Sequence, residues 1–325
     1  MLEILFIGLV LIILYITYKW YRYCQLLPGN NGDKYVFITG CDTGFGFMLT
    51  KRLDSLGFKV FPGCLTERGM DNVKNQTSNN IIPVQIDVTK QASIDQAFTF
   101  VKSKLPPNKG LWGLVNNAGI AGAVGPVDWL SREDYDVCLA VNLFGMIDVT
   151  KTFLPLIRDY RGRIVNITSM MGRIAAAPCP YVVSKFGAEG YCDVLRRDLY
   201  YTGTTVHILE PGFFATNIAE PNSVNNSIRK TYENLPLETK EYYGQEYVDN
   251  MTDSVKRLLN HVTSPKTEKV VNAYVHALTA KYPKYRYVVG VDANTVFRML
   301  WTVPEWLSDL IITCTRPKPK GLIKR

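Results

Sequence analysis

The sequence has few histidines and no closely paired cysteines. Its three histidines, His207, His261 and His276, form no pair with metal-ligand spacing, and they leave little material for a Ser/His/Asp triad. The seven cysteines are odd in number and include no C-x-x-C pair, so neither a disulfide framework nor a thiolate metal site is expected. The sequence therefore predicts no metal site, and its thiols suit a reducing compartment.

Acidic residues are outnumbered, with 29 Asp and Glu against 37 Lys and Arg and a formal net charge of +8. The positive residues do not form a stripe with interleaved aromatics, so no nucleic-acid partner is expected. They are densest in the segment Arg316–Arg325, which contains no acid and follows an apolar segment. This tail is interpreted either as a contact with an anionic membrane surface or as a solvated terminus.

An uncharged apolar run occupies residues 4–18. At about 1.5 Å per residue the run alone is slightly shorter than the roughly 20 residues that span a bilayer. Lys19 and Arg22, interleaved with three aromatic residues, extend it with the belt typical of a membrane interface. Glu3 precedes the run and bulky residues follow it, unlike a cleaved signal peptide. Residues 1–23 are therefore predicted to be an uncleaved membrane anchor, with residues 4–23 in contact with the membrane.

The charges flanking this run bear on its orientation. Lys19 and Arg22 lie downstream of it, so the positive-inside rule places the rest of the chain in the cytosol. The membrane is expected to be that of the endoplasmic reticulum or another intracellular membrane. A lumenal domain stays open, because it would explain three N-x-S/T sequons. These lie at Asn75, Asn225 and Asn250. A fourth sequon, at Asn166, falls in a predicted core strand and is interpreted as a folding residue.

The remaining chain reads as one α/β domain. Residues 24–33 are a linker by composition, and the domain is predicted over 34–294. Short β-rich runs alternate with segments of helical character, which predicts a Rossmann-type, doubly wound parallel sheet covered on both faces. The runs are residues 35–39, 58–61, 81–86, 111–115, 163–167 and 206–209.

Two later segments have alternative interpretations. Residues 223–260 are polar, rich in tyrosine and predicted to be helical, either as a cover for an active site or as plain surface helix. The C-terminal segment, residues 295–325, contains an apolar stretch at 296–313 that is interrupted by Pro304 and by charges. That stretch is predicted to be an interfacial membrane helix or to pack on the domain.

A glycine-rich loop follows the first predicted strand. Residues 39–46 read TGCDTGFG, which is G-x-x-x-G-x-G between a strand and a helical segment. Glycines there allow a tight turn and let a pyrophosphate approach the N-terminus of the helix. By itself such a loop could serve any strand-to-helix turn.

Further motifs resemble the short-chain dehydrogenase/reductase family. Besides the loop, the chain has NNAG at 116–119, VNLFG at 141–145, NITSMMG at 166–172, YVVSK at 181–185 and EPGFFAT at 210–216. The residues within these motifs, together with the N-terminal anchor, resemble the retinol and hydroxysteroid dehydrogenase branch of the family. The resemblance implies that a nicotinamide dinucleotide is bound by Gly40, Asp42, Thr43, Gly44, Phe45, Gly46, Asp87, Val88, Asn116, Ala118, Gly119, Lys185, Pro211, Gly212 and Thr216.

Tyr181 and Lys185 are the candidate catalytic pair. Four residues apart, they share one face of a helix, and a nearby ammonium group is expected to lower the tyrosine pKa. Tyr181 would then exchange a proton with a substrate hydroxyl or carbonyl oxygen. Ser169 is expected to bind the substrate oxygen, and Asn142 resembles the family residue that positions a water behind the lysine. Each could alternatively be structural.

The choice between NAD and NADP depends on missing charges. An NAD-selective fold usually has an acid at the end of the second strand, but Gly63 stands near that position. Residues 41–45 offer no cation for a 2′-phosphate, and Asp42 would repel one. NAD is therefore expected, with NADP as the alternative.

These observations predict an oxidoreductase for a hydrophobic alcohol, ketone or aldehyde, with a retinoid or hydroxysteroid as the favoured substrate. One alternative is a short hydroxy acid such as 3-hydroxybutyrate, whose carboxylate would need a cation, with Arg173 as the candidate. Another is a non-catalytic scaffold that binds the cofactor. The oligomeric state is left open.

Overall fold

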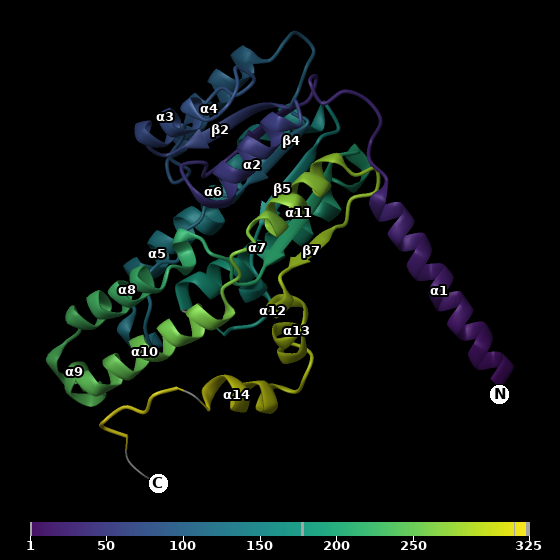
Figure 1. Cartoon of the computed structure of the whole chain (residues 1–325). Helices are drawn as coiled ribbons and strands as arrows, with labels where there is room; N and C mark the ends of the chain where they lie inside the picture. The colour runs from purple at the N-terminus through teal and green to yellow at the C-terminus, as the bar shows by residue number, and fades with distance from the viewer. Residues whose placement is uncertain (1, 177–178, 315, 323–325) are drawn as a thin grey trace.

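A computed structural model describes residues 2–176, 179–314 and 316–322. The ends of the predicted anchor and tail, residues 1 and 323–325, lie outside the described residues. Seven parallel strands form one sheet in the order β3-β2-β1-β4-β5-β6-β7 (Figure 1), which confirms the predicted doubly wound fold. The strands are β1 (Tyr35–Ile38), β2 (Lys59–Cys64), β3 (Val84–Gln85), β4 (Gly113–Asn116), β5 (Arg163–Ile167), β6 (Thr205–Pro211) and β7 (Arg286–Val289).

The strands differ from the sequence expectation at the sheet edges. β3 has only two residues where a run over 81–86 was expected, and Ile81 contributes an isolated bridge to Val60. Pro83 interrupts the run because it has no N–H to donate to the ladder. At the other edge, β7 extends the sheet beyond the six expected strands.

Helices cover both faces of the sheet. One face carries α2 (Gly44–Ser55), α3 (Glu67–Asn75) and α11 (Glu268–Thr279). The other carries α4 (Gln91–Lys104), α6 (Gly145–Arg158) and α7 (Cys179–Asp198). Alternate residues of β1 divide between the two cores, because successive strand side chains point to opposite faces. Upstream of α6 lie the short helix α5 (Arg132–Leu139) and a π-helical turn, Ala140–Phe144.

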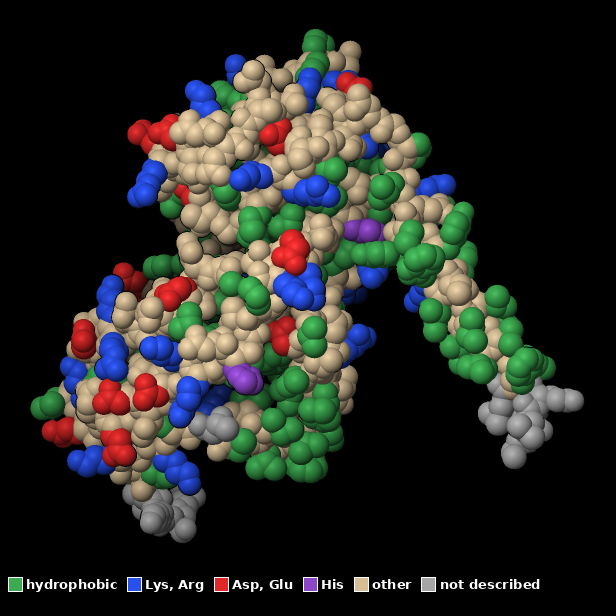
Figure 2. Space-filling model, in the orientation of Figure 1, with side chains coloured by type: hydrophobic (Ala, Val, Ile, Leu, Met, Phe, Trp, Pro, Cys, Tyr) green, Lys and Arg blue, Asp and Glu red, His purple; other side chains and the backbone are tan. Residues whose placement is uncertain are grey.

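Helix α1 (Leu2–Cys24) projects away from the domain (Figure 1). Its side chains from Phe6 to Ile16 are largely apolar and mostly exposed (Figure 2). Its last turn contacts the domain, where Tyr23 stacks on His276 with ring centroids 3.9 Å apart. Beyond the helix, Leu27 N–H donates to the Thr279 carbonyl. Among the described residues, the helix that is long and apolar enough by composition to cross a membrane is the run Arg132–Arg158. Within that run, α6 packs Val149, Phe153 and Ile157 into the core against the sheet.

Between β6 and β7, the segment predicted to be helical forms three helices. These are α8 (Pro221–Glu233), α9 (Leu237–Tyr243) and α10 (Gln245–Val262). Their aromatic side chains pack on Trp129, whose ring centroid lies 5.1 Å from that of Tyr243. The tail contacts the same unit, because Lys320 N–H and Gly321 N–H donate to the Tyr243 and Tyr242 carbonyls.

The C-terminal apolar stretch breaks into short helices. They are α12 (Val291–Asn294), α13 (Val296–Leu300) and α14 (Glu305–Thr313), with Pro304 at the N-cap of α14. Phe297 and Trp301 pack against the core near Met170, whereas Trp306 and Leu310 are exposed. Hydrophobic side chains gather on the surface around α12–α14 (Figure 2). The segment therefore packs on the domain and also presents an apolar outer face.

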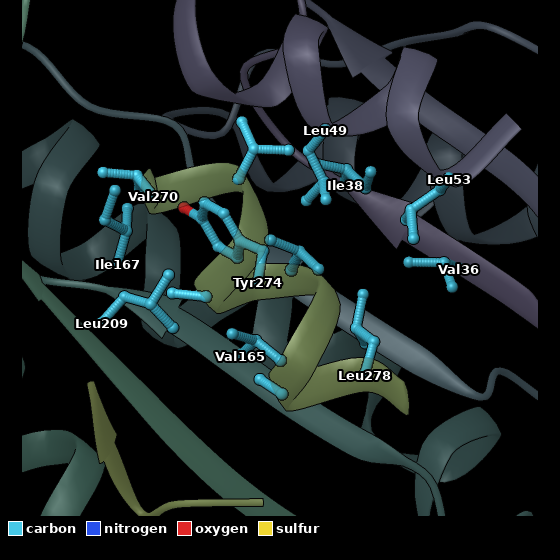
Figure 3. Packing of buried hydrophobic residues seen from close by; sticks show 14 of the residues in the cluster. Val36, Ile38, Leu49, Leu53, Val165, Ile167, Leu209, Val270, Tyr274 and Leu278 are labelled. Atoms are coloured by element: carbon cyan, nitrogen blue, oxygen red, sulfur yellow. The ribbon is translucent and has the colours of Figure 1, made fainter. Parts of the chain in front are cut away.

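Tyr274 of α11 connects the core to the functional edge of the sheet. It is fully buried among Ile38, Leu49 and Leu209 (Figure 3). A buried phenol needs a partner for its hydroxyl, and Tyr274 donates to Asn117 Oδ1 at 3.0 Å. The core thus extends to the residue that follows β4.

Candidate active site

The predicted site residues gather beyond the carboxyl ends of the parallel strands. The glycine loop follows β1, Asp87 follows β3, Gly119 follows β4, Ser169 follows β5 and Gly212 follows β6. Parallel strands place all these ends along one edge, and the strand order reverses between β1 and β4. In open α/β sheets ligands bind at that reversal.

Ser169, Tyr181 and Lys185 come together at this edge. Met171 N–H donates to Ser169 Oγ at 3.1 Å, which leaves the Ser169 hydroxyl proton available for Tyr181. Hydrogen bonding from Ser169 lowers the pKa of Tyr181, but burial has the larger effect and raises it to about 12. Lys185 Nζ lies 5.5 Å from the centre of the Tyr181 ring and donates to the Ile167 carbonyl at 3.4 Å.

The prediction that Lys185 lowers the pKa of Tyr181 is wrong for the chain by itself. Burial also lowers the pKa of Lys185, to about 8, because the surrounding protein disfavours its charged form. The Lys185 ammonium lies beside the Tyr181 ring and donates to the Ile167 carbonyl, and desolvation is the largest influence on the pKa of both groups. Burial therefore favours the protonated phenol, which is the form that acts as a general acid in reduction.

Asn142 lies in the π-helical turn before α6. Its Oδ1 accepts from Ile120 N–H at 2.8 Å, and its Nδ2 donates to the Ile120 carbonyl at 2.9 Å and to Ser184 Oγ at 3.0 Å. These bonds join the turn to the segment after β4 and to α7. A π-turn inserts an extra residue into a helix and often marks a functional position.

The glycine loop has the geometry of a dinucleotide cradle. A Cβ on Gly46 would lie 2.4 Å from the Gly40 carbonyl oxygen, and one on Gly40 would lie 2.7 Å from Ala118 Cα. Gly44, with φ +63°, has open space at its Cβ position in the first turn of α2. The backbone is close-packed beneath the loop and open above the helix N-terminus, so these residues fit a pyrophosphate.

The sequence analysis missed Asn117, which shapes the loop from below. Its Nδ2 donates to the Thr39 and Gly40 carbonyls, both at 3.0 Å, and its Oδ1 accepts from Tyr274. Asn117 stands second in the quoted NNAG motif, which was the available signal. Thr39 Oγ1 in turn accepts from the N–H groups of Asn117 and Ala118.

Some predicted cofactor-binding residues form hydrogen bonds or ion pairs with other residues of the protein. Asn116 Nδ2 donates to Thr150 Oγ1 and Asn166 Oδ1, both at 2.8 Å, so this amide joins β4 to β5 and α6. The buried position of Asn166 agrees with its interpretation as a folding residue. Asp87 accepts from the Thr89 hydroxyl at 2.6 Å, which is the main cause of its lowered carboxyl pKa, and the Thr89 N–H and Lys90 lower that pKa further.

The other predicted cofactor residues lie near the carboxyl ends of the parallel strands. Val88 packs closely on Gly145. Pro211 ends β6, and a Cβ on the following Gly212 would meet the Asp292 carboxylate at 2.2 Å. Thr216 begins a short turn, and the next residue, Asn217, donates to Thr43 Oγ1 at 3.3 Å. Phe45, in the first turn of α2, contacts Phe214 edge-on.

The Asp42 carboxylate lies at the end of β2, where an NAD-binding acid usually stands. It accepts from Leu65 N–H at 2.8 Å, Thr66 N–H at 3.0 Å and Thr66 Oγ1 at 2.7 Å. A loop residue after β1 therefore places a negative charge beside β2, although β2 itself ends without an acid.

Arg173 is already paired with protein groups. Its Nη2 donates to Glu210 Oε1 at 3.2 Å. The guanidinium that a hydroxy-acid substrate would need is therefore held by an internal carboxylate. No group of three or more metal-ligating side chains occurs within residues 2–176, 179–314 and 316–322.

Known proteins resemble this chain over most of its length. The short chain dehydrogenase family model matches residues 34–227. Human short-chain dehydrogenase/reductase family 9C member 7 is 40% identical, covering 93% of this chain and 96% of that protein. Human 17-beta-hydroxysteroid dehydrogenase type 6 is 42% identical, with coverages of 94% and 96%. Retinol dehydrogenase 7 of Rattus norvegicus is 42% identical, with coverages of 88% and 90%.

Solved structures share the fold. A short chain dehydrogenase/reductase from Burkholderia phymatum in complex with NAD has a TM-score of 0.68 and 20% identity, covering 91% of this chain and 100% of that one. A short chain dehydrogenase from Burkholderia cenocepacia in complex with NADP has a TM-score of 0.65 and 19% identity, with coverages of 88% and 99%.

The chain belongs to the short-chain dehydrogenase family, and it is an NAD(P)-dependent oxidoreductase. Within the family it falls with the proteins named retinol dehydrogenases and 17-beta-hydroxysteroid dehydrogenases, which confirms the predicted branch.

Proposed function

We propose that this enzyme transfers a hydride between NAD and an apolar alcohol or its carbonyl counterpart, most favourably a retinoid or a hydroxysteroid. The observation that carries the proposal is the meeting of Ser169, Tyr181 and Lys185 beside the glycine cradle. The names of the similar proteins support the substrate class, as does the apolar surface around α12–α14.

The protein residues have separate tasks in this reaction. Ser169 donates a hydrogen bond to the reacting oxygen. Tyr181 gives its hydroxyl proton to that oxygen in reduction, and as the phenolate it takes the substrate's hydroxyl proton in oxidation. Lys185 keeps a positive charge near the phenol below its pKa of about 8. The nicotinamide ring, when bound, supplies or accepts the hydride. Asn142 holds α7 against the segment after β4, so the phenol and the ammonium stay in register.

The substrate class is tested by a turnover screen. Full-length protein in detergent or nanodiscs is offered retinol, 3α-, 3β- and 17β-hydroxysteroids and 3-hydroxybutyrate, each with NAD and with NADP. We expect formation of reduced cofactor, measured by absorbance, with retinoids or steroids and no turnover of 3-hydroxybutyrate. A preference for the hydroxy acid would overturn the substrate class.

We further propose that α1 anchors the enzyme in an intracellular membrane with its domain in the cytosol. The 23 residues of α1 extend about 34 Å at about 1.5 Å per residue, enough to cross a bilayer core of roughly 30 Å. At the base of α1, Arg22 lies 4.1 Å from the Tyr282 ring centre, and Lys284 lies 4.3 Å from that of Tyr23. This basic and aromatic collar suits the level of phospholipid headgroups.

Membrane attachment is tested by alkaline extraction and protease protection. We expect the full chain to stay in the membrane pellet at alkaline pH, and its domain to be digested in sealed, cytosol-side-out vesicles. Deleting residues 2–18 should release most of the protein. Adding Trp306→Ser and Leu310→Ser to the deletion should release any fraction still held by α14. A protease-protected, glycosylated domain would instead place it in the lumen.

A further inference from the structure

A buried cluster of charges lies directly behind the proposed catalytic groups. We call it the acid cluster: Glu189 of α7 and Glu210 of β6, with Arg173, Arg286 and Thr168. The two carboxylate side chains are 8% and 1% exposed. Arg286 Nη1 donates to both Glu189 Oε2 and Glu210 Oε1, and Arg173 donates to Glu210.

Such a cluster is costly to form. Two adjacent carboxylates out of water repel one another, and each loses hydration. Arg286 offsets this cost only because it lies between them. An apolar filling would serve packing equally well, so buried charges alone do not explain this arrangement. The acid cluster also contacts the proposed active site, and that contact suggests why the charges are buried there.

Thr168 joins the acid cluster to Ser169. Its hydroxyl donates to Glu189 Oε1, and its backbone N–H donates to the Leu209 carbonyl at 2.8 Å. Thr168 immediately precedes Ser169, and Glu189 lies one helical turn beyond Lys185. The Thr168–Glu189 hydrogen bond therefore ties the end of β5 to the helix that carries Tyr181 and Lys185.

Close packing at the next turn strengthens this connection. A Cβ on Gly172 would lie 2.8 Å from both the Lys185 carbonyl oxygen and Glu189 Cγ. The Ser169–Gly172 turn thus rests directly on α7, with its start held by Thr168. A small rotation at Thr168 would move Ser169 Oγ along the face of α7.

We propose that Thr168 and Glu189 are positioning residues that hold Ser169 Oγ at the Tyr181 hydroxyl. This inference rests on the proposed function of Ser169 and Tyr181. Arg286 and Glu210 keep the Glu189 carboxylate in place, which gives the charge cluster a role in the geometry of the reaction.

The test compares Thr168→Val, which has a similar shape but no hydroxyl, with Thr168→Ser, which keeps the hydroxyl. We expect Thr168→Val to lower kcat about 10-fold with KM changed less than about twofold, because the hydroxyl that contacts the Glu189 carboxylate and the Leu209 carbonyl is lost. Thr168→Ser should keep kcat near the wild-type value. Thr252→Val, at another buried threonine, is the control and should leave kcat unchanged.

A double variant separates positioning from general structural damage. On a Ser169→Ala background, Thr168→Val should cause no further loss of kcat, because the group it positions is gone. A further 10-fold loss on that background, or equal losses in Thr168→Val and Thr168→Ser, would overturn the proposal.

Crystal structures give a readout that does not depend on turnover. In Thr168→Val, Ser169 Oγ should leave the Tyr181 hydroxyl while α7 keeps its position, and in Thr168→Ser it should stay. If the wild-type protein turns over no substrate, the proposed function fails, and the crystal structures still decide the positioning role. An unmoved Ser169 Oγ in Thr168→Val would refute it.

Discussion

Tyr181→Phe is expected to lower kcat by between about 100-fold and 10,000-fold in either direction of the reaction, the range typical of a lost general acid or base. The ring packing should survive, because phenylalanine fills nearly the same space. Cofactor affinity should stay within about twofold, since the glycine cradle is built from β1, α2 and the NNAG segment. Stopped-flow and steady-state absorbance of the reduced cofactor measure the rate, and fluorescence titration measures the affinity.

Tyr191→Phe is the matched control for this experiment. Tyr191 lies on the same helix, and burial raises its pKa to about 12, as it does for Tyr181. Its hydrogen-bond partner is Thr150 of α6. If Tyr181→Phe keeps wild-type turnover, the proton-transfer role is wrong. If the wild type itself turns over none of the candidates, a non-catalytic cofactor-binding scaffold gains support.

Asp42→Asn is expected to shift the preference for NAD over NADP by about 100-fold towards NADP. Two like charges held close together repel by about 2 to 3 kcal/mol at an effective dielectric of about 20, which corresponds to about 100-fold in affinity. The substitution removes the negative charge at the end of β2 but keeps one oxygen that can accept from Leu65 or Thr66. The ratio of kcat/KM for the two cofactors is the measurement.

The control for Asp42 is a charge change on the neighbouring helix. Asp71→Asn, at an exposed position of α3, removes the same charge outside the loop and should leave the cofactor ratio within about twofold. An unchanged ratio in Asp42→Asn would mean that another group selects the cofactor. A lower affinity for both cofactors would show that Asp42 serves mainly to hold the β2–α3 turn.

Several site features were predictable because they depend on neighbours in the chain. The TGCDTGFG loop requires glycines for a turn that is local, and Tyr181 and Lys185 share a helix face through their spacing alone. Asn117 was available in a motif, but its two bonds to the glycine loop depend on β4 pairing with β1. Nothing in the local pattern of Thr168 or Glu189 indicates that they meet across the fold.

The pKa values show most clearly where sequence reasoning ends. Spacing placed a lysine beside a tyrosine, which favoured a lowered tyrosine pKa. The structure buries Lys185 and partly buries Tyr181, and the loss of hydration outweighs the influence of the neighbouring charge on their pKa values. Burial is a property of the packed interior and cannot be obtained from a four-residue interval.

The sequence by itself determined the alternating α/β pattern, the glycine loop and the residue types of the site, because each follows from short-range backbone and side-chain preferences. The tertiary structure decided which strand ends share one edge, that Asp42 reaches the end of β2, and that Glu189 supports the Ser169 turn. The contacts of Asp42 and of Glu189 join residues 21 to 24 positions apart, and only packing of the whole domain brings them together.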